Sequence, residues 1–172
     1  MLVPAYLWAV LGAIMLATCV LFGGWSEPAK AVSPPPAQLA ITDLGTLGGV
    51  YNHPTAINDR GQVVGSSYLT ASEERHAVLW EGGKITDLGT LPSGDFSFAF
   101  GINNRGQVVG LSNSASGEAH AVLWENGKMT DLGTLPGGED FSSFASGINN
   151  RGQVVGNSST ASGEFHAVLW TK

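Results

Sequence analysis

The sequence is short of charge, of basic residues and of cysteine. Charged side chains make up 13% of the 172 residues, and the single cysteine is Cys19. One cysteine excludes an internal disulfide and a cysteine-rich metal site. Only 8 Lys and Arg residues stand against 14 Asp and Glu, so the basic clusters that bind a nucleic-acid backbone are missing and no nucleic-acid partner is expected. Hydrophobic residues reach 43%, which argues against wholesale disorder.

Familiar catalytic signatures are also missing. The chain has no Gly-x-Ser-x-Gly elbow, no His-Glu-x-x-His pair, no phosphate loop and no Rossmann fingerprint. We therefore expect a protein that is not an enzyme and that carries no cofactor and no catalytic or metal-ligating residue.

The N-terminus lacks charge and is apolar over residues 5–22, apart from three side chains. The small residues of Ala29-Lys30-Ala31 stand where a signal peptidase cleaves, and prolines follow. Residues 1–31 are therefore predicted to be a signal peptide or, because the apolar run nearly spans a bilayer, an uncleaved membrane-anchor helix. Lipidation of Cys19 is a third route. Residues 32–40 form a Pro-rich linker.

Each of these routes exports the rest of the chain. The expected location is therefore extracellular, at the cell surface or in the periplasm. Contact with a membrane is expected only through the N-terminal segment, if that segment is not cleaved.

Residues 41–172 contain three copies of one unit of about 44 residues. A Thr-Asp-Leu-Gly-Thr-Leu motif begins at residues 42, 86 and 130. An Ile-Asn-(Asn/Asp)-Arg-Gly-Gln-Val-Val-Gly motif begins at residues 57, 102 and 148, and a His-Ala-Val-Leu-Trp motif begins at residues 76, 120 and 166. We divide the domain into repeats 41–84, 85–128 and 129–172.

The repeats have the pattern of short antiparallel strands. The His-Ala-Val-Leu-Trp motif alternates its side chains between two faces and is followed by Gly82-Gly83 or Asn126-Gly127, which are strong signals for a tight hairpin turn. The Asn-Asn-Arg-Gly sequence from Asn103 predicts a second hairpin, which turn chemistry alone explains. About four strands per repeat and no helical period after residue 40 predict an all-β domain.

The two ends of the repeat domain lack complementary strands. The first Thr-Asp-Leu-Gly motif, at residues 42–45, has no His-Ala-Val-Leu-Trp motif before it, and the motif at 166–170 has no Thr-Asp-Leu-Gly motif after it. Unpaired strand edges promote aggregation, and closed β-rings remove them. We therefore expect the two ends to meet, either within one chain or between two chains.

The three motifs resemble the bacterial extracellular HAF repeats, with valine at residues 78, 122 and 168 in place of the phenylalanine of His-Ala-Phe. The resemblance covers residues 41–172 and implies a secreted or surface-exposed protein built of propeller-like blades. It brings no catalytic or ligand-binding residue with it. Because typical propellers have about 4–8 blades, three copies leave three arrangements open: a six-bladed ring of two chains, an open array, or a β-trefoil.

Repeated residues are predicted to be structural. Each histidine is expected to form a hydrogen bond to a loop or to the Thr-Asp pair, and each tryptophan is expected to pack between repeats. The alternative is that the three histidines converge and bind a metal ion. The arginines before each turn glycine are interpreted as exposed turn residues or partners of the Thr-Asp carboxylates. The structural positions are His76, Trp80, His120, Trp124, His166 and Trp170.

A local function should lie where the repeats differ. Segments 48–56, 92–101 and 136–147 carry aromatic rings beside acids and histidine, which suit a carbohydrate or protein ligand, unless the phenylalanines only fill space between repeats. The second variable set, 66–75, 111–119 and 157–165, is expected to form solvent loops. The candidate surface is Tyr51, His53, Asp95, Phe96, Phe98, Glu139, Asp140 and Phe141.

The function expected from these patterns is an exported, non-catalytic β-repeat scaffold that binds a ligand or serves a structural role. The alternatives are an extracellular glycan-acting enzyme using Asp95 or Asp140, and a partial propeller that functions only as an oligomer. The candidate partners are a second copy of the chain, completing a ring, and a carbohydrate or protein ligand.

Overall fold

The structure is a computed structural model that describes residues 39–70, 74–136 and 142–171. Residues 42–172 form one unit, which is described below. The predicted signal peptide or anchor helix, most of the Pro-rich linker and the candidate residues Glu139, Asp140 and Phe141 lie outside the described residues. Within those residues, no helix is long and apolar enough to cross a membrane.

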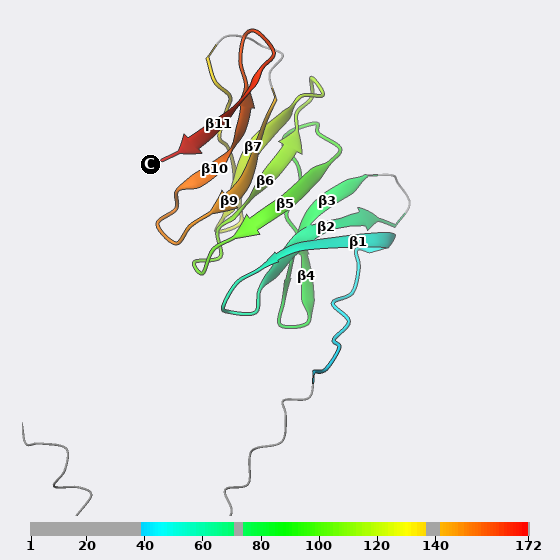
Figure 1. The fold of residues 1–172 in the computed structure, drawn as a ribbon. Helices are drawn as coiled ribbons and strands as arrows, with labels where there is room; N and C mark the ends of the chain where they lie inside the picture. Colours follow the sequence, from blue (N-terminus) through cyan, green and yellow to red (C-terminus); the bar gives the residue numbers. More distant parts are fainter. Residues whose placement is uncertain (1–38, 71–73, 137–141, 172) are drawn as a thin grey trace, which may run out of the picture. The chain divides into compact units, whose positions relative to one another are not determined.

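The described residues form strands that assemble into three antiparallel sheets, which confirms the all-β prediction (Figure 1). The first sheet has the order β1-β2-β3-β4, the second β5-β6-β7-β8 and the third β11-β10-β9. The strands are β1 (Gly48–Ile57), β2 (Val63–Leu69), β3 (Arg75–Glu81), β4 (Lys84–Asp87), β5 (Ser97–Ile102), β6 (Val108–Asn113), β7 (Ala119–Glu125), β8 (Lys128–Asp131), β9 (Ser143–Ile148), β10 (Val154–Ser159) and β11 (Phe165–Trp170).

Each predicted hairpin turn is present where its sequence requires it. β3 and β4 pair antiparallel through the turn at Gly82 and Gly83, with φ angles of 57° and 76°. β7 and β8 pair in the same way through Asn126 and Gly127, with φ angles of 53° and 72°. Two successive positive φ angles match the right-handed twist of the flanking strands, and glycine and asparagine reach them at low cost.

A glycine in the second strand of each sheet permits a close approach of backbones. A side-chain Cβ on Gly110 would collide with the carbonyl oxygen of Phe98, and one on Gly156 would collide with that of Phe144. In both sheets the strand pairing shifts register beside these residues, as in a β-bulge. The glycine of the Val-Val-Gly motif is therefore set by contact within the sheet, beyond any role in a turn.

The core lies between neighbouring sheets. One cluster joins the first and second sheets and contains Val64, Ala77, Ala99, Val108, Val122 and Trp124. The other joins the second and third sheets and contains Val109, Ala121, Leu123, Ala145 and Val154. The second sheet thus packs against a neighbour on each side, and the sheets do not close into a barrel. On the faces that point away from the second sheet, Val155 and Leu169 of the third sheet and Ile57 of the first are exposed, whereas Val78 and Trp80 of the first are buried.

Two expectations about variable segments were wrong. Segment 48–56 lies almost entirely within β1 and is not a connecting loop. Segments 66–75, 111–119 and 157–165 begin as continuations of β2, β6 and β10 and bury Ser67, Ser112 and Ser158 completely. Serine-rich sequence looks solvated, but these hydroxyls have hydrogen-bond partners inside the fold, so burial costs them little.

Candidate functional site

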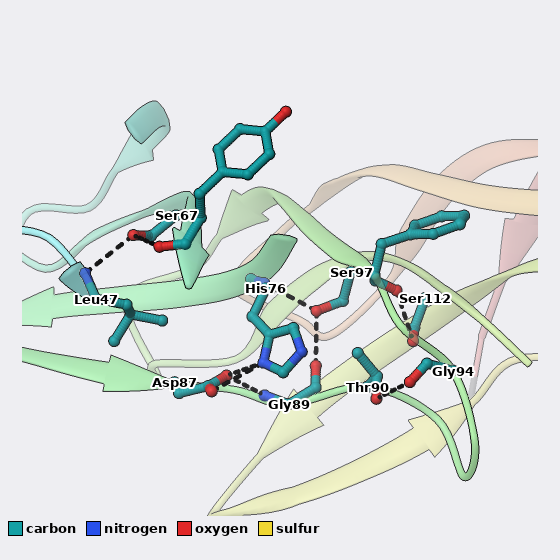
Figure 2. Close-up of polar contacts among 12 residues, drawn as sticks. Leu47, Ser67, His76, Asp87, Gly89, Thr90, Gly94, Ser97 and Ser112 are labelled. Carbon is teal, nitrogen blue, oxygen red and sulfur yellow. Dashed lines mark hydrogen bonds and ion pairs between the residues drawn. The ribbon is translucent and has the colours of Figure 1, made fainter. Parts of the chain in front are cut away.

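The histidine of the His-Ala-Val-Leu-Trp motif contacts the aspartate of the following strand. Nδ1 of His76 lies 2.8 Å from Oδ2 of Asp87 (Figure 2), and Nδ1 of His120 lies 2.7 Å from Oδ2 of Asp131. Each aspartate also accepts a hydrogen bond from the backbone N–H of a glycine two residues later. These carboxylates therefore join two neighbouring strands and start the turn that leaves the sheet.

The third pair is split between the two ends of the unit. His166 is exposed on β11 and approaches only Glu164, at 3.9 Å, among the described residues. Asp43 is exposed as well, and its Oδ1 accepts the backbone N–H of Gly45 at 2.9 Å. Each terminus thus presents one half of a pair that is complete in the first two sheets.

Buried serines form contacts that the sequence patterns did not reveal. The hydroxyl of Ser97 accepts the backbone N–H of Ala77 at 2.8 Å and donates to the carbonyl of Gly89 at 2.6 Å (Figure 2). The hydroxyl of Ser143 makes the same two bonds with Ala121 and Gly133. Each serine begins the first strand of a sheet and ties it to the preceding sheet. In the sequence, the only sign of these contacts is a serine five residues before the Ile-Asn motif.

The Asn-Asn-Arg-Gly turns also link one repeat to the next, which corrects the interpretation by turn chemistry alone. The side chain of Asn103 accepts backbone N–H bonds from Arg105 and Gln107 within its own turn. Its amide then donates to the carbonyl of Asn149 in the next repeat at 3.0 Å. Asn58 donates to the carbonyl of Asn103 at the same distance. The turns therefore form a ladder of hydrogen bonds across the sheets.

The arginines of these turns do not contact the Thr-Asp carboxylates. Arg60 is exposed, donates to the carbonyl of Asn104 at 3.4 Å and lies 3.8 Å from Glu81. Arg105 donates to the carbonyl of Asn150. The expectation that they are exposed turn residues agrees with the structure, and the alternative pairing with Asp43 or its equivalents is wrong.

The three tryptophans of the His-Ala-Val-Leu-Trp motif differ in burial and in hydrogen bonding. Trp80 and Trp124 are buried, whereas Trp170 is only half-buried and packs against the second core cluster. The indole N–H of Trp80 donates to the carbonyl of Gly45 at 3.2 Å. That of Trp124 has no hydrogen-bond partner among the described residues. Trp124 packs with Val64 of the first sheet, so it contributes to the contact between repeats.

The candidate surface residues do not form one cluster. Tyr51 and His53 are exposed on β1, whereas Phe96 and Phe98 are half-buried near the start of β5. The carboxylate of Asp95 accepts the side-chain amide of Asn113 at 2.6 Å, so it helps to hold the strand start. Tyr51 thus lies on a strand of the first sheet, whereas Asp95 lies just before the first strand of the second sheet.

Two residues that sequence reasoning missed connect these aromatic rings. Tyr68 packs edge-on against Tyr51, with ring centroids 6.3 Å apart. The guanidinium of Arg75 lies 5.4 Å from the centre of the Tyr68 ring and 4.6 Å from that of Phe98. We call Tyr51, Tyr68, Arg75 and Phe98 the aromatic patch. The equivalent pair is Asn113 and Ala119 in the second repeat and Ser159 and Phe165 in the third, so the paired tyrosine and arginine occur in the first repeat alone.

A groove of about 530 Å³ opens beside the aromatic patch. It is lined by Gly48, Gly49, Val50, Tyr51, Tyr68, Leu69 and Thr70. Val50 and Tyr51 are 87% and 71% exposed, so the groove walls face solvent. The side chain of Arg75 is held by a 3.0 Å hydrogen bond from its Nε to the hydroxyl of Ser66, which limits its freedom before any ligand arrives.

The described residues contain no group of three or more His, Cys, Asp or Glu side chains that could hold a metal ion. Comparison of the chain with protein-family models, with curated proteins and with solved structures finds no match. The aromatic patch and its groove are the candidate functional site, because aromatic rings and a guanidinium group meet there beside exposed side chains.

Proposed function

We propose that the chain is an exported, non-catalytic β-repeat scaffold that binds a saccharide at the aromatic patch and its groove. The observation that carries the proposal is the aromatic patch itself, where the exposed Tyr51 lies beside the half-buried Tyr68 and Arg75, a tyrosine–arginine pair that the other repeats lack. Export rests on the predicted signal or anchor over residues 1–31.

The scaffold part of the proposal is supported by what the repeated side chains do. The histidine of each complete repeat contacts its own aspartate, the serine at each sheet start bonds two backbone groups, and the turn asparagines bond the next repeat. Polar groups engaged in this way stabilise the fold. Nothing favours the glycan-acting enzyme separately, because Asp95 bonds Asn113 and Asp140 lies outside the described residues.

The propeller-like interpretation is part of this proposal. Three separate sheets that stack face to face, two of them with four strands, support blades rather than a β-trefoil. Membership of the HAF repeat family and a position at the cell surface remain predictions from the sequence motifs.

The chemistry of the groove favours a saccharide over an apolar ligand. Tyrosine rings offer flat apolar faces with a polar hydroxyl at one end, which suits the alternating apolar and polar surface of a sugar ring. The guanidinium adds several fixed donors for hydroxyl or carboxylate oxygens.

A binding experiment on an immobilised panel of neutral and acidic polysaccharides tests the proposal. Retention of the chain on at least one polysaccharide is expected, with Tyr51→Ala weakening it about tenfold and Tyr51→Phe, which keeps the ring, weakening it less. Tyr51 is exposed, so both variants should unfold at the same temperature as the wild type. Absence of retention, Tyr51→Ala binding like the wild type, or Tyr51-dependent capture of a protein without any polysaccharide would each contradict the proposal.

A further inference from the structure

The two outer faces of the unit are the two halves of an interface that the chain already makes twice. Val64, Val109 and Val155 occupy equivalent positions, each paired across strands with a leucine of the His-Ala-Val-Leu-Trp motif. Val64 and Val109 are completely buried because the next sheet covers them, whereas Val155 is 49% exposed. The leucine that pairs with Val155, Leu169, is 58% exposed.

The opposite face of the first sheet shows the complementary exposure. In the second and third sheets, Ile102 and Ile148 are partly buried against the core clusters that lie between sheets. The equivalent residue of the first sheet, Ile57, is 67% exposed. Val78 and Trp80 on the same face are buried, and the indole N–H of Trp80 donates to the carbonyl of Gly45. The third sheet therefore exposes side chains that bind a following sheet, and the first sheet exposes, at Ile57, one of those that bind a preceding sheet.

The strand edges are complementary in the same sense. β4 pairs with β3 so that Thr86 lies opposite Leu79 and Asp87 opposite Val78, and β8 pairs with β7 in the same register. β11 is the edge strand of its sheet in the described residues, where Leu169 and Val168 have β10 on one side and no strand on the other. Residues 40–43 match β4 and β8 at the repeat spacing, and Leu44 matches Leu88. They have no partner strand in the described residues, and the same register would place Thr42 opposite Leu169.

This register also completes the split polar pair. In the first two sheets the paired strands bring histidine Nδ1 to within 2.7–2.8 Å of the aspartate. The same pairing on β11 would bring His166 to Asp43, and both side chains are exposed. The backbone N–H of Leu44 would then reach the carbonyl of Ala167, as that of Leu88 reaches Ala77 at 2.9 Å.

The turn ladder continues across the same contact. Asn58 donates to the carbonyl of Asn103, and Asn103 donates to that of Asn149. Among the described residues, the Asn149 amide bonds only the side chain of Gln153, at 2.7 Å, which leaves a second N–H of the amide group for another acceptor. The carbonyl of Asn58 in the first sheet of another copy of the chain would be that acceptor.

Residues 42–44 cannot make this contact within their own chain. The carbonyl of Gly45 accepts the indole N–H of Trp80, and the N–H of Leu47 donates to Ser67, so this segment is held to the first sheet. Three extended residues span only about 10 Å. The third sheet lies beyond the second, and two sheet spacings amount to about 20 Å.

We propose that two copies of this chain assemble head to tail into a closed ring of six sheets, each copy placing residues 42–44 beside β11 of the other as its fourth strand. Head-to-tail interfaces close into rings when the rotation per unit permits it. Six sheets fall within the range of about 4–8 blades that propellers use, whereas three copies would exceed it. The proposal is independent of the saccharide site.

A disulfide trap in the full-length chain tests the ring. The variant combines Thr42→Cys and Leu169→Cys in a Cys19→Ser background and is oxidised in mild detergent. Directly opposed strand residues lie within the reach of a disulfide. The expected product is a covalent dimer with no free thiol, because a two-copy ring forms two identical disulfides. Thr86→Cys with Leu79→Cys in the same background is the positive control and should form a disulfide within one chain.

The remaining outcomes contradict the ring. A monomer with free thiols, a monomer with an internal disulfide, or a ladder of higher multiples would each overturn it, and neither cysteine alone should give a dimer.

A second measurement uses no cysteine. Asp43→Lys should raise the dissociation constant from sedimentation at least tenfold, whereas the exposed Glu74→Lys, with the same change of charge, should leave it unchanged. A dissociation constant that Asp43→Lys does not alter would remove the proposed Asp43–His166 contact.

Discussion

Nδ1 of His120 lies 2.7 Å from Oδ2 of Asp131, and the pair joins the last two strands of the second sheet. His76 and Asp87 repeat the contact in the first sheet at 2.8 Å. In these two sheets the histidine of the repeat motif thus faces the aspartate of the next strand, and the two residues are separated in sequence only by a tight hairpin.

The His76–Asp87 contact should contribute to stability. A double-mutant cycle with His76→Ala and Asp87→Asn should give a coupling energy of about 1 kcal/mol, because the aspartate is partly solvated and water screens the attraction. Urea denaturation followed by tryptophan fluorescence measures it. A coupling energy near zero would mean that the two side chains act independently of each other.

The buried hydroxyl of Ser143 should be more costly to remove than that of an exposed serine. Ser143→Ala leaves the Ala121 N–H and the Gly133 carbonyl without their partner, so a loss of about 2 kcal/mol is expected. Ser146→Ala removes an exposed hydroxyl bonded to Val155 at 3.2 Å and should change stability by less than about 0.5 kcal/mol. Equal losses in thermal denaturation would be inconsistent with the serine contact.

Gly156 should not tolerate a methyl group. Gly156→Ala would place a Cβ against the Phe144 carbonyl, and the strands would have to separate, at a cost above about 2 kcal/mol. Gly147 is the matched control on the paired strand, since a Cβ there would be 3.4 Å from Val155 Cγ2, an ordinary contact. Gly147→Ala should remain within about 1 kcal/mol of the wild type in urea. The reverse order of the two variants would refute the close approach.

Asn103 should be a main support of the turn ladder. Its side chain is 4% exposed and bonds its own turn, Gln107 and the next repeat, so Asn103→Ala should cost about 2–4 kcal/mol. Arg60→Ala, which removes an exposed hydrogen bond to Asn104 and an exposed ion pair with Glu81, should cost less than about 0.5 kcal/mol. Amide hydrogen exchange would show the loss as faster exchange in both the second and third sheets. A loss confined to the turn itself would argue against the link between repeats.

The strand and hairpin pattern was predictable because its causes are local. Gly82-Gly83 and Asn126-Gly127 impose positive φ angles on neighbouring residues, and alternating side chains define the faces of β3 and β7. Ser67 and Ser112 were misread as solvent loop because their burial depends on hydroxyl partners at Leu47 and Leu91, about twenty residues away.

The candidate site was predictable only in part. Tyr51 and Phe98 were recognised as variable aromatic residues, but nothing in the sequence brings them to the same surface. Arg75 lies between them in space because β3 of the first sheet approaches β5 of the second, where Arg75 and Phe96 form an isolated bridge. Contacts between separate sheets follow from packing, which no short motif encodes.

The sequence by itself determined that the domain is all-β, repeated and turn-rich, because strand alternation and turn glycines act over a few residues. Only the tertiary structure decided which polar groups meet between sheets and at which positions a side chain larger than glycine would collide with a neighbouring strand. It also decided which side chains on the outer faces of the unit remain exposed. Those outcomes depend on residues about 45 positions apart coming into contact, such as Asn58 with Asn103. Burial and hydrogen bonding over such separations exist only once the sheets have stacked.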